Sequence, residues 1–120
     1  MCSSDLTLAA REATMEALRV RTGAVLIHPF DDPRIIAGQG TAALELLDEV
    51  PDLEMVVAPV GGGGLLSGTA IAVRGTSAAV RVVGAEPALA DDAARSLQAG
   101  RILPPLRTDT IADEIGRAHV

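Results

Sequence analysis

The sequence predicts an α/β fold in which helices alternate with the strands of a parallel sheet. Three short apolar runs indicate buried strands, and a segment with helical spacing of its apolar residues separates each run from the next. Successive strands joined by a helix form a parallel sheet with right-handed crossovers. The chain has one aromatic residue, Phe30, so its core must consist of Ala, Val, Ile and Leu, which suits helices packed tightly on a sheet.

The N-terminal part is expected to hold a helix, a strand and a second helix. Leu8–Arg21 spaces its apolar residues at helical intervals and mixes them with charges, which predicts an amphipathic helix. Ala24–Ile27 is an apolar run too short for a helix and precedes the turn-rich stretch HPFDDP, so it predicts a buried strand and a loop. Pro33–Glu49 predicts a helix that begins with proline and has Asp32 as its N-cap.

The rest of the chain continues the alternation around a run of four glycines. The expected order is strand, helix, strand and helix, over Glu54–Pro59, Leu65–Arg74, Val80–Pro87 and Ala90–Gly100.

Composition and charge exclude several classes of partner. The formal net charge is −6 and there is no basic run, which argues against nucleic acid and anionic membranes. The uncharged stretch Met55–Val73 contains five glycines and a proline, which favours strand, loop and helix over a membrane span. A signal-peptide pattern is absent and the single Cys2 gives no disulfide framework, so we expect a cytoplasmic protein.

The stretch PVGGGGLLSG, Pro59 to Gly68, places four glycines between a strand and a helix. Consecutive glycines lose much conformational freedom on folding, so this position must need backbone without side chains. Ligands of parallel sheets bind at the carboxyl ends of the strands, and a helix that begins there presents free N–H groups and the positive end of its dipole. The loop therefore predicts a phosphate site.

The glycines alone leave several interpretations of this site open. A Walker-type site needs a lysine, and this loop has two leucines there. A dinucleotide site needs G-x-G-x-x-G, which Gly62, Gly64 and Gly68 miss by one position, although Glu86 lies at a suitable distance to bind a ribose. A tight turn without a ligand needs only one or two glycines. A non-enzymatic anion-binding α/β module and the phosphate cup of a pyridoxal phosphate enzyme remain.

Both termini match translated sequencing-adapter DNA. MCSSDL, residues 1–6, corresponds to one adapter strand, and the residues from 114 to 120 correspond to the other, with the first base of codon 114 from the insert. Such segments are set aside in fold reasoning. We expect the natural segment to be residues 7–113.

Four landmarks in order resemble the threonine dehydratase and serine racemase group of fold type II pyridoxal phosphate enzymes. They are HPFDDPRIIAGQGTAALELL (His28–Leu47), VAPVGGGGLLSG (Val57–Gly68), GAEPALADDAARSL (Gly84–Leu97) and TIAD (Thr110–Asp113). The resemblance spans nearly the whole natural segment. It implies part of a three-layer fold like that of the tryptophan synthase β subunit, with residues 7–32 ending the small domain and 33–113 in the large cofactor-binding domain.

The resemblance also implies two binding sites. The cofactor's phosphate would be held by the backbone amides of Gly61, Gly62, Gly63, Gly64 and Leu65. A divalent cation would be held by Glu86, the carbonyl of Ala90 and Asp92, whose hard oxygens suit Mg²⁺ or Ca²⁺. The alternative for these acids is stabilisation of a helix N-terminus, worth about 0.3–1 kcal/mol.

Three polar residues have weaker assignments. Arg11 falls where racemase-like members have an arginine near the substrate carboxylate, although a helix-surface arginine is the commoner meaning. His28 belongs to the passage between the two domains, and Gln39 faces the same cleft, both in structural roles. Gly38 and Gly40 flank Gln39 within a helix, where each costs about 1 kcal/mol relative to Ala, so they indicate a close approach of backbone or ligand.

The chain itself contains no candidate catalytic residue. All ten of its basic residues are arginine, and enzymes of this class bind the cofactor covalently through a lysine that also moves the substrate's α-proton. By resemblance that lysine lies upstream. Glu114 departs from the family's glycine after TIAD. We expect the parent to be a homo-oligomeric ammonia-lyase or racemase for serine or threonine, and this chain alone to be inactive and poorly soluble.

Overall fold

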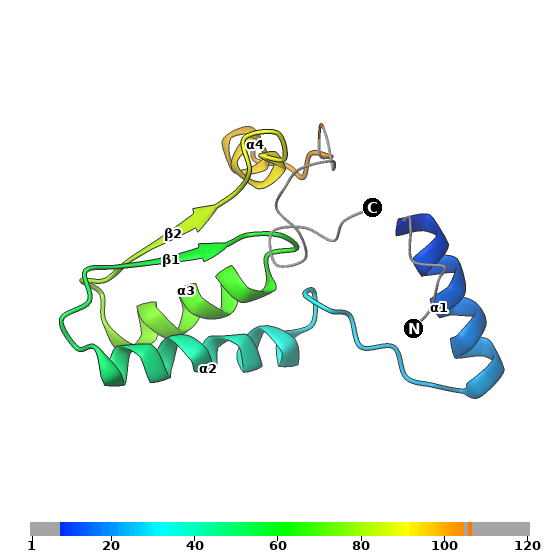
Figure 1. Cartoon of the computed structure of the whole chain (residues 1–120), viewed down its shortest axis with the longest axis horizontal. Helices are drawn as coiled ribbons and strands as arrows, with labels where there is room; N and C mark the ends of the chain where they lie inside the picture. The colour runs from blue at the N-terminus through cyan, green and yellow to red at the C-terminus, as the bar shows by residue number, and fades with distance from the viewer. Residues whose placement is uncertain (1–7, 105, 107–120) are drawn as a thin grey trace.

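The computed structural model describes residues 8–104 and 106. Four helices and two strands follow one another in these residues (Figure 1). Their order is α1 (Leu8–Thr22), α2 (Pro33–Glu49), β1 (Met55–Pro59), α3 (Gly64–Thr76), β2 (Arg81–Ala85) and α4 (Asp92–Ala99). The mixed α/β class is confirmed, and α2 has the predicted bounds.

β1 and β2 pair in parallel, from Met55 opposite Arg81 to Pro59 opposite Ala85. α3 connects the two strands and contacts both of them, and α2 packs along α3. The sheet, α3 and α2 therefore form three successive layers (Figure 1). Gly84 permits the close approach of α3, because a Cβ at this position would lie 2.9 Å from Cδ2 of Leu66.

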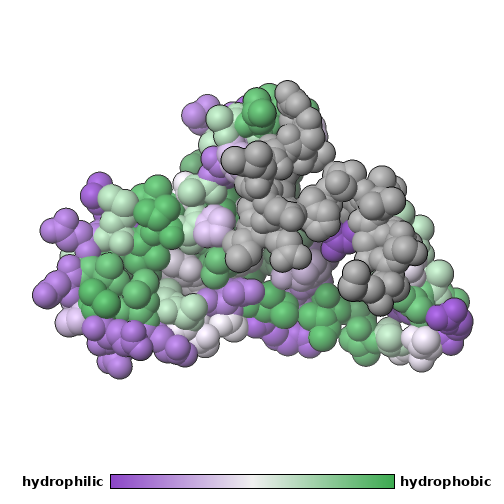
Figure 2. All heavy atoms as spheres, viewed as in Figure 1, coloured by the Kyte–Doolittle hydropathy of each residue, from purple (hydrophilic) through white to green (hydrophobic). Residues whose placement is uncertain are grey.

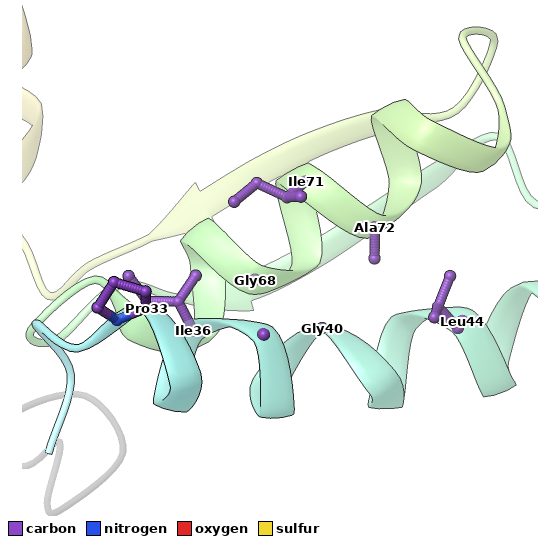
Figure 3. Close-up of a pocket in the computed structure, with 8 residues that line it drawn as sticks. Pro33, Ile36, Gly40, Leu44, Gly68, Ile71 and Ala72 are labelled. Atoms are coloured by element: carbon purple, nitrogen blue, oxygen red, sulfur yellow. The ribbon is translucent and has the colours of Figure 1, made fainter. Parts of the chain in front are cut away.

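Two glycines bring α2 and α3 together. A Cβ on Gly40 would lie 2.8 Å from the carbonyl oxygen of Gly68, and a Cβ on Gly68 would lie 2.7 Å from the Gly40 nitrogen. The close backbone approach predicted for Gly40 is therefore present, whereas Gly38 faces open space. An apolar groove of about 400 Å³ lies between α2 and α3, and the residues that line it include Leu44 of α2 and Ile71 of α3 (Figure 3).

The prediction of a strand at Ala24–Ile27 is wrong. The segment is neither helix nor strand, and its side chains are exposed, with Val25 at 82% and Ile27 at 56%. A strand exists only through hydrogen bonds to a neighbour, and the described residues provide no strand that pairs with this one. An apolar run specifies burial, but it does not specify which strand will pair with it.

The sheet is covered by helices on one face only in the described residues. Ala58 is buried under α3, whereas Val57 and Val83, which point to the opposite face, are 59% and 40% exposed. Figure 2 shows hydrophobic residues at the surface of the part of the molecule that contains the strands, α2 and α3. Among the described helices, none is long and apolar enough to cross a membrane.

Candidate functional site

The glycine loop lies at the carboxyl ends of both strands, between β1 and α3 (Figure 1). The Val60 N–H donates to the carbonyl of Ala85 at 3.1 Å, which ties the start of the loop to the end of β2. Gly61 and Gly63 adopt positive φ values of 51° and 90°. This left-handed backbone is disfavoured for residues with a Cβ, so conformation alone favours glycine at both positions.

The N-terminus of α3 carries N–H groups that have no acceptor among the residues that the structure describes. Gly63 is the N-cap residue and supplies no side-chain acceptor. The Gly63 N–H donates to the carbonyl of Val60 at 2.8 Å, so the structure already uses one of the five amides predicted to hold phosphate. The predicted donors that have no protein acceptor within the described residues are those of Gly61, Gly62, Gly64 and Leu65. Unpaired donors at a helix N-terminus form a ready anion site.

Three of these four residues, Gly62, Gly64 and Leu65, line a pocket of about 390 Å³. The residues that line it are Pro29, Phe30, Gln39, Val60, Gly62, Gly63, Gly64 and Leu65. Gln39 thus lies beside the glycine loop, and its place in a cleft between two domains stays a prediction. Phe30 is a wall of the pocket that the sequence interpretation did not identify. The sequence feature that could have pointed to Phe30 is that it is the chain's single aromatic residue and lies in a turn rich in Pro and Asp.

His28 organises the turn that carries Phe30. Its Nδ1 atom accepts a hydrogen bond from the Asp31 N–H at 2.9 Å, and its ring meets the Phe30 ring edge to face, with 4.6 Å between centroids and an interplanar angle of 87°. Edge-to-face geometry suits the quadrupoles of two aromatic rings. These contacts give His28 a structural role within its turn, and its place in the passage between two domains stays a prediction.

Asp32 fixes the start of α2 beside this turn. Its carboxylate accepts from the Arg34 N–H at 2.8 Å and pairs with the Arg34 guanidinium at 2.7 Å. The side-chain hydrogen bond from Arg34, followed by its backbone hydrogen bond, lowers the pKa of Asp32 from 3.8 to about 2. The predicted N-cap is confirmed, and it is ionised at neutral pH.

The acids predicted to bind a cation gather at the N-terminus of α4. The Glu86 carboxylate accepts hydrogen bonds from Ala93 N at 3.1 Å and Ala94 N at 2.9 Å, and Asp92 is the first residue of the helix. Ala90 is buried just before it, at 1% exposure. Within the described residues, no group of three or more His, Cys, Asp or Glu side chains is placed to hold a metal ion. The contacts of Glu86 are those of a helix N-terminal cap.

Arg11 does not reach the glycine pocket. It is exposed on α1 and is not among the residues that line the pocket. α1 itself contacts no other helix or strand in the part of the chain that the structure describes. The structure thus brings together the glycine loop, Phe30 and Gln39, and leaves Arg11 apart.

Comparison with known proteins gives one consistent family. A sequence profile of the family described as "Pyridoxal-phosphate dependent enzyme" matches residues 3–120. A serine racemase from Oryza sativa subsp. indica is 44% identical over 110 residues, which cover 92% of this chain and 32% of the relative. An L-threonine ammonia-lyase from Geobacter sulfurreducens is 48% identical over 106 residues, covering 88% of this chain and 26% of the relative. The chain thus spans a third or less of these relatives.

Among solved structures, maize serine racemase superposes with a TM-score of 0.88 at 43% identity. The superposition covers 95% of this chain and 36% of the maize chain.

Proposed function

Because the chain belongs to the family of pyridoxal-phosphate dependent enzymes, we propose that it supplies the phosphate-binding loop of a serine or threonine ammonia-lyase or a serine racemase. The observation that carries this proposal is the set of N–H groups at the N-terminus of α3 that have no protein acceptor in the described residues, those of Gly61, Gly62, Gly64 and Leu65. The curated relatives named serine racemase and L-threonine ammonia-lyase support the choice of reaction.

The loop fits a phosphate group in both shape and charge. Gly61 and Gly63 adopt positive φ, and no atom lies within 4 Å of the Cβ position of Gly63, so the backbone at Gly63 can approach a ligand without a side chain in the way. The N-terminus of α3 contributes the positive end of its dipole, which favours a dianion. Neutral N–H groups hold a phosphate in place without providing a proton to it.

The residues of this chain position the cofactor. Pyridoxal phosphate, when bound, withdraws electrons from the α-carbon of an amino acid and stabilises the carbanion formed there. The N–H groups of the loop bind its phosphate, and Phe30 and Gln39 form the adjoining walls of the pocket. In enzymes of this class a lysine moves the α-proton, and this chain has no lysine, so that base belongs to another part of the enzyme.

Several features of the parent enzyme follow as part of this proposal. It is a cytoplasmic homo-oligomer that acts on a free amino acid and binds neither nucleic acid nor membrane. Residues 7–32 end its small domain and residues 33–113 belong to its large domain, a division supported by the lack of contacts between α1 and the other described elements. The 120-residue chain alone is inactive, because it has no lysine. It is also poorly soluble, because Val57 and Val83 leave an apolar sheet face exposed.

We also propose a divalent cation at Glu86, the carbonyl of Ala90 and Asp92. Hard oxygen donors suit Mg²⁺ or Ca²⁺, and a carboxylate such as that of Glu86 retains acceptor capacity after accepting two N–H hydrogen bonds. Calorimetric titration of the chain with Mg²⁺ and Ca²⁺ tests this site. We expect saturable binding that Asp92→Asn weakens, and unchanged heats in Asp92→Asn would refute the proposal.

The phosphate proposal is tested by comparing three ligands of the 120-residue chain. Equilibrium dialysis should show saturable binding of pyridoxal 5′-phosphate and of inorganic phosphate, in competition with each other, and much weaker binding of pyridoxal, which has the ring without the phosphate. Borohydride reduction should attach the cofactor to no side chain, because the chain has no lysine. Equal affinity for pyridoxal and its phosphate would contradict the proposal.

A non-enzymatic anion-binding module is the second candidate, because the loop N–H groups that have no acceptor in the described residues would bind any small anion. Such a module would bind inorganic phosphate with the same affinity as pyridoxal 5′-phosphate, since it would have no use for the ring. Tighter binding of the complete cofactor would exclude it.

A further inference from the structure

The Phe30 ring lies directly against the glycine loop. A Cβ placed on Gly62 would overlap Cγ and Cδ1 of this ring and lie 2.7 Å from Cδ2. A Cβ on Gly64 would lie 3.0 Å from the Cα and Cβ atoms of Phe30 and 3.1 Å from its carbonyl oxygen. The backbone and the side chain of Phe30 therefore both contact the loop. More than thirty residues separate Phe30 from Gly62 in the sequence.

The loop glycines have different reasons for being glycine. Gly63 has φ +90° and no atom within 4 Å of its Cβ position, so its backbone conformation, and not lack of space, disfavours a side chain. Gly62 has no positive φ, and alanine could adopt its backbone. What excludes a side chain at position 62 is the Phe30 ring.

We propose that Phe30 is a positioning residue that holds the glycine loop in its anion-binding shape. This inference rests on the proposed function, because it assumes that the loop binds phosphate. The ring packs on Gly62, a member of the donor set, and the backbone of Phe30 packs on Gly64, the first residue of α3. The His28 imidazole stands edge-on to the ring at 4.6 Å, and its Nδ1 caps the turn through the Asp31 N–H, so the ring itself is held in place.

This arrangement links the free energy of loop ordering to phosphate affinity. A loop with four glycines has many accessible backbone conformations, and only those that converge the N–H groups bind the anion. If removal of the ring leaves the loop in its binding shape about one-tenth of the time, the apparent Kd for phosphate rises about tenfold.

The test combines two substitutions in a double-mutant cycle on the 120-residue chain, carried on a cleavable solubility partner. The Kd for inorganic phosphate is measured for the original chain, Phe30→Ala, Gly62→Ala and the double variant, with far-UV circular dichroism to confirm folding. Leu44→Ala is the matched control, because Leu44 is 47% exposed against 42% for Phe30 and does not line the glycine pocket. Phe30→Tyr keeps the ring and serves as the conservative variant.

We expect Phe30→Ala to raise the phosphate Kd about tenfold, with Phe30→Tyr and Leu44→Ala close to the original chain. Gly62→Ala should weaken binding strongly alone and much less in the Phe30→Ala background, because the ring that its methyl group meets is gone. Since Phe30 is the chain's single aromatic residue, 4-fluorophenylalanine labels this site alone, and its ¹⁹F signal should shift on addition of phosphate.

Two results would overturn the inference while leaving the phosphate loop intact. They are an unchanged phosphate Kd in a folded Phe30→Ala variant, and a Gly62→Ala penalty of equal size in both backgrounds. If Phe30→Ala does not fold, Phe30→Leu takes its place in the cycle and is held to the same two criteria. Failure of the original chain to bind phosphate would overturn the proposed function and this inference together.

Discussion

Replacing Gly63 with alanine tests whether the backbone conformation of the loop, rather than its space, requires glycine. Gly63 has φ +90° and ψ −10°, with open space around its Cβ position. Left-handed backbone costs an L-residue about 1–2 kcal/mol, so we expect Gly63→Ala to lower the free energy of unfolding by about that amount. Gly38 also faces open space but lies inside α2. Alanine there should raise the free energy of unfolding by about 0.5–1 kcal/mol.

The two variants therefore differ in sign, and neither one adds a steric clash. Urea unfolding followed by far-UV circular dichroism measures both. With a slope of about 1–3 kcal/mol per molar urea, the midpoints should move in opposite directions by roughly 0.5 M. A Gly63→Ala variant as stable as Gly38→Ala would refute the assignment of a strained left-handed backbone to this loop.

Three further substitutions test other parts of the account. Gly68→Ala should destabilise the chain by about 1–3 kcal/mol through overpacking against the Gly40 backbone, and thermal unfolding with an unchanged midpoint would contradict that contact. The depressed pKa of Asp32 means that its contribution to stability is complete above pH 3.8 and is lost as the pH falls through about 2. Asp32→Asn should remove this dependence from an acid titration of helicity, and a curve identical to that of the original chain would refute it. Glu86→Ala should weaken the first turn of α4 by about 1–3 kcal/mol, seen as faster amide exchange at Ala93 and Ala94; unchanged exchange there would count against the cap.

The helices and the glycine loop before α3 could be predicted from sequence because their causes are local. Asp32 and the proline after it specify the start of α2, and both take the predicted positions. Four adjacent glycines before a helix specify an unhindered helix N-terminus. Each of these signals acts within a few residues, so the local sequence is sufficient to predict both features.

The rest of the site depends on contacts between distant residues. The contact of Phe30 with Gly62 has no local signature, and it gives a second reason for a glycine that had been explained by phosphate alone. The turn that uses the Gly63 N–H depends on φ angles that composition does not specify. The apolar run of Ala24–Ile27 predicts a strand, but a strand needs a pairing partner, and the described sheet contains only β1 and β2.

The most direct test of the account is an NMR titration of the chain, labelled with ¹⁵N at glycine and leucine, with pyridoxal 5′-phosphate. We predict large amide shifts at Gly61, Gly62, Gly64 and Leu65, reproduced by inorganic phosphate and absent with pyridoxal. Gly38 and Gly75, which lie within α2 and α3 away from the loop, should remain unchanged. Saturable cofactor binding that leaves the four loop amides unshifted would contradict the assignment of this glycine run as the phosphate site.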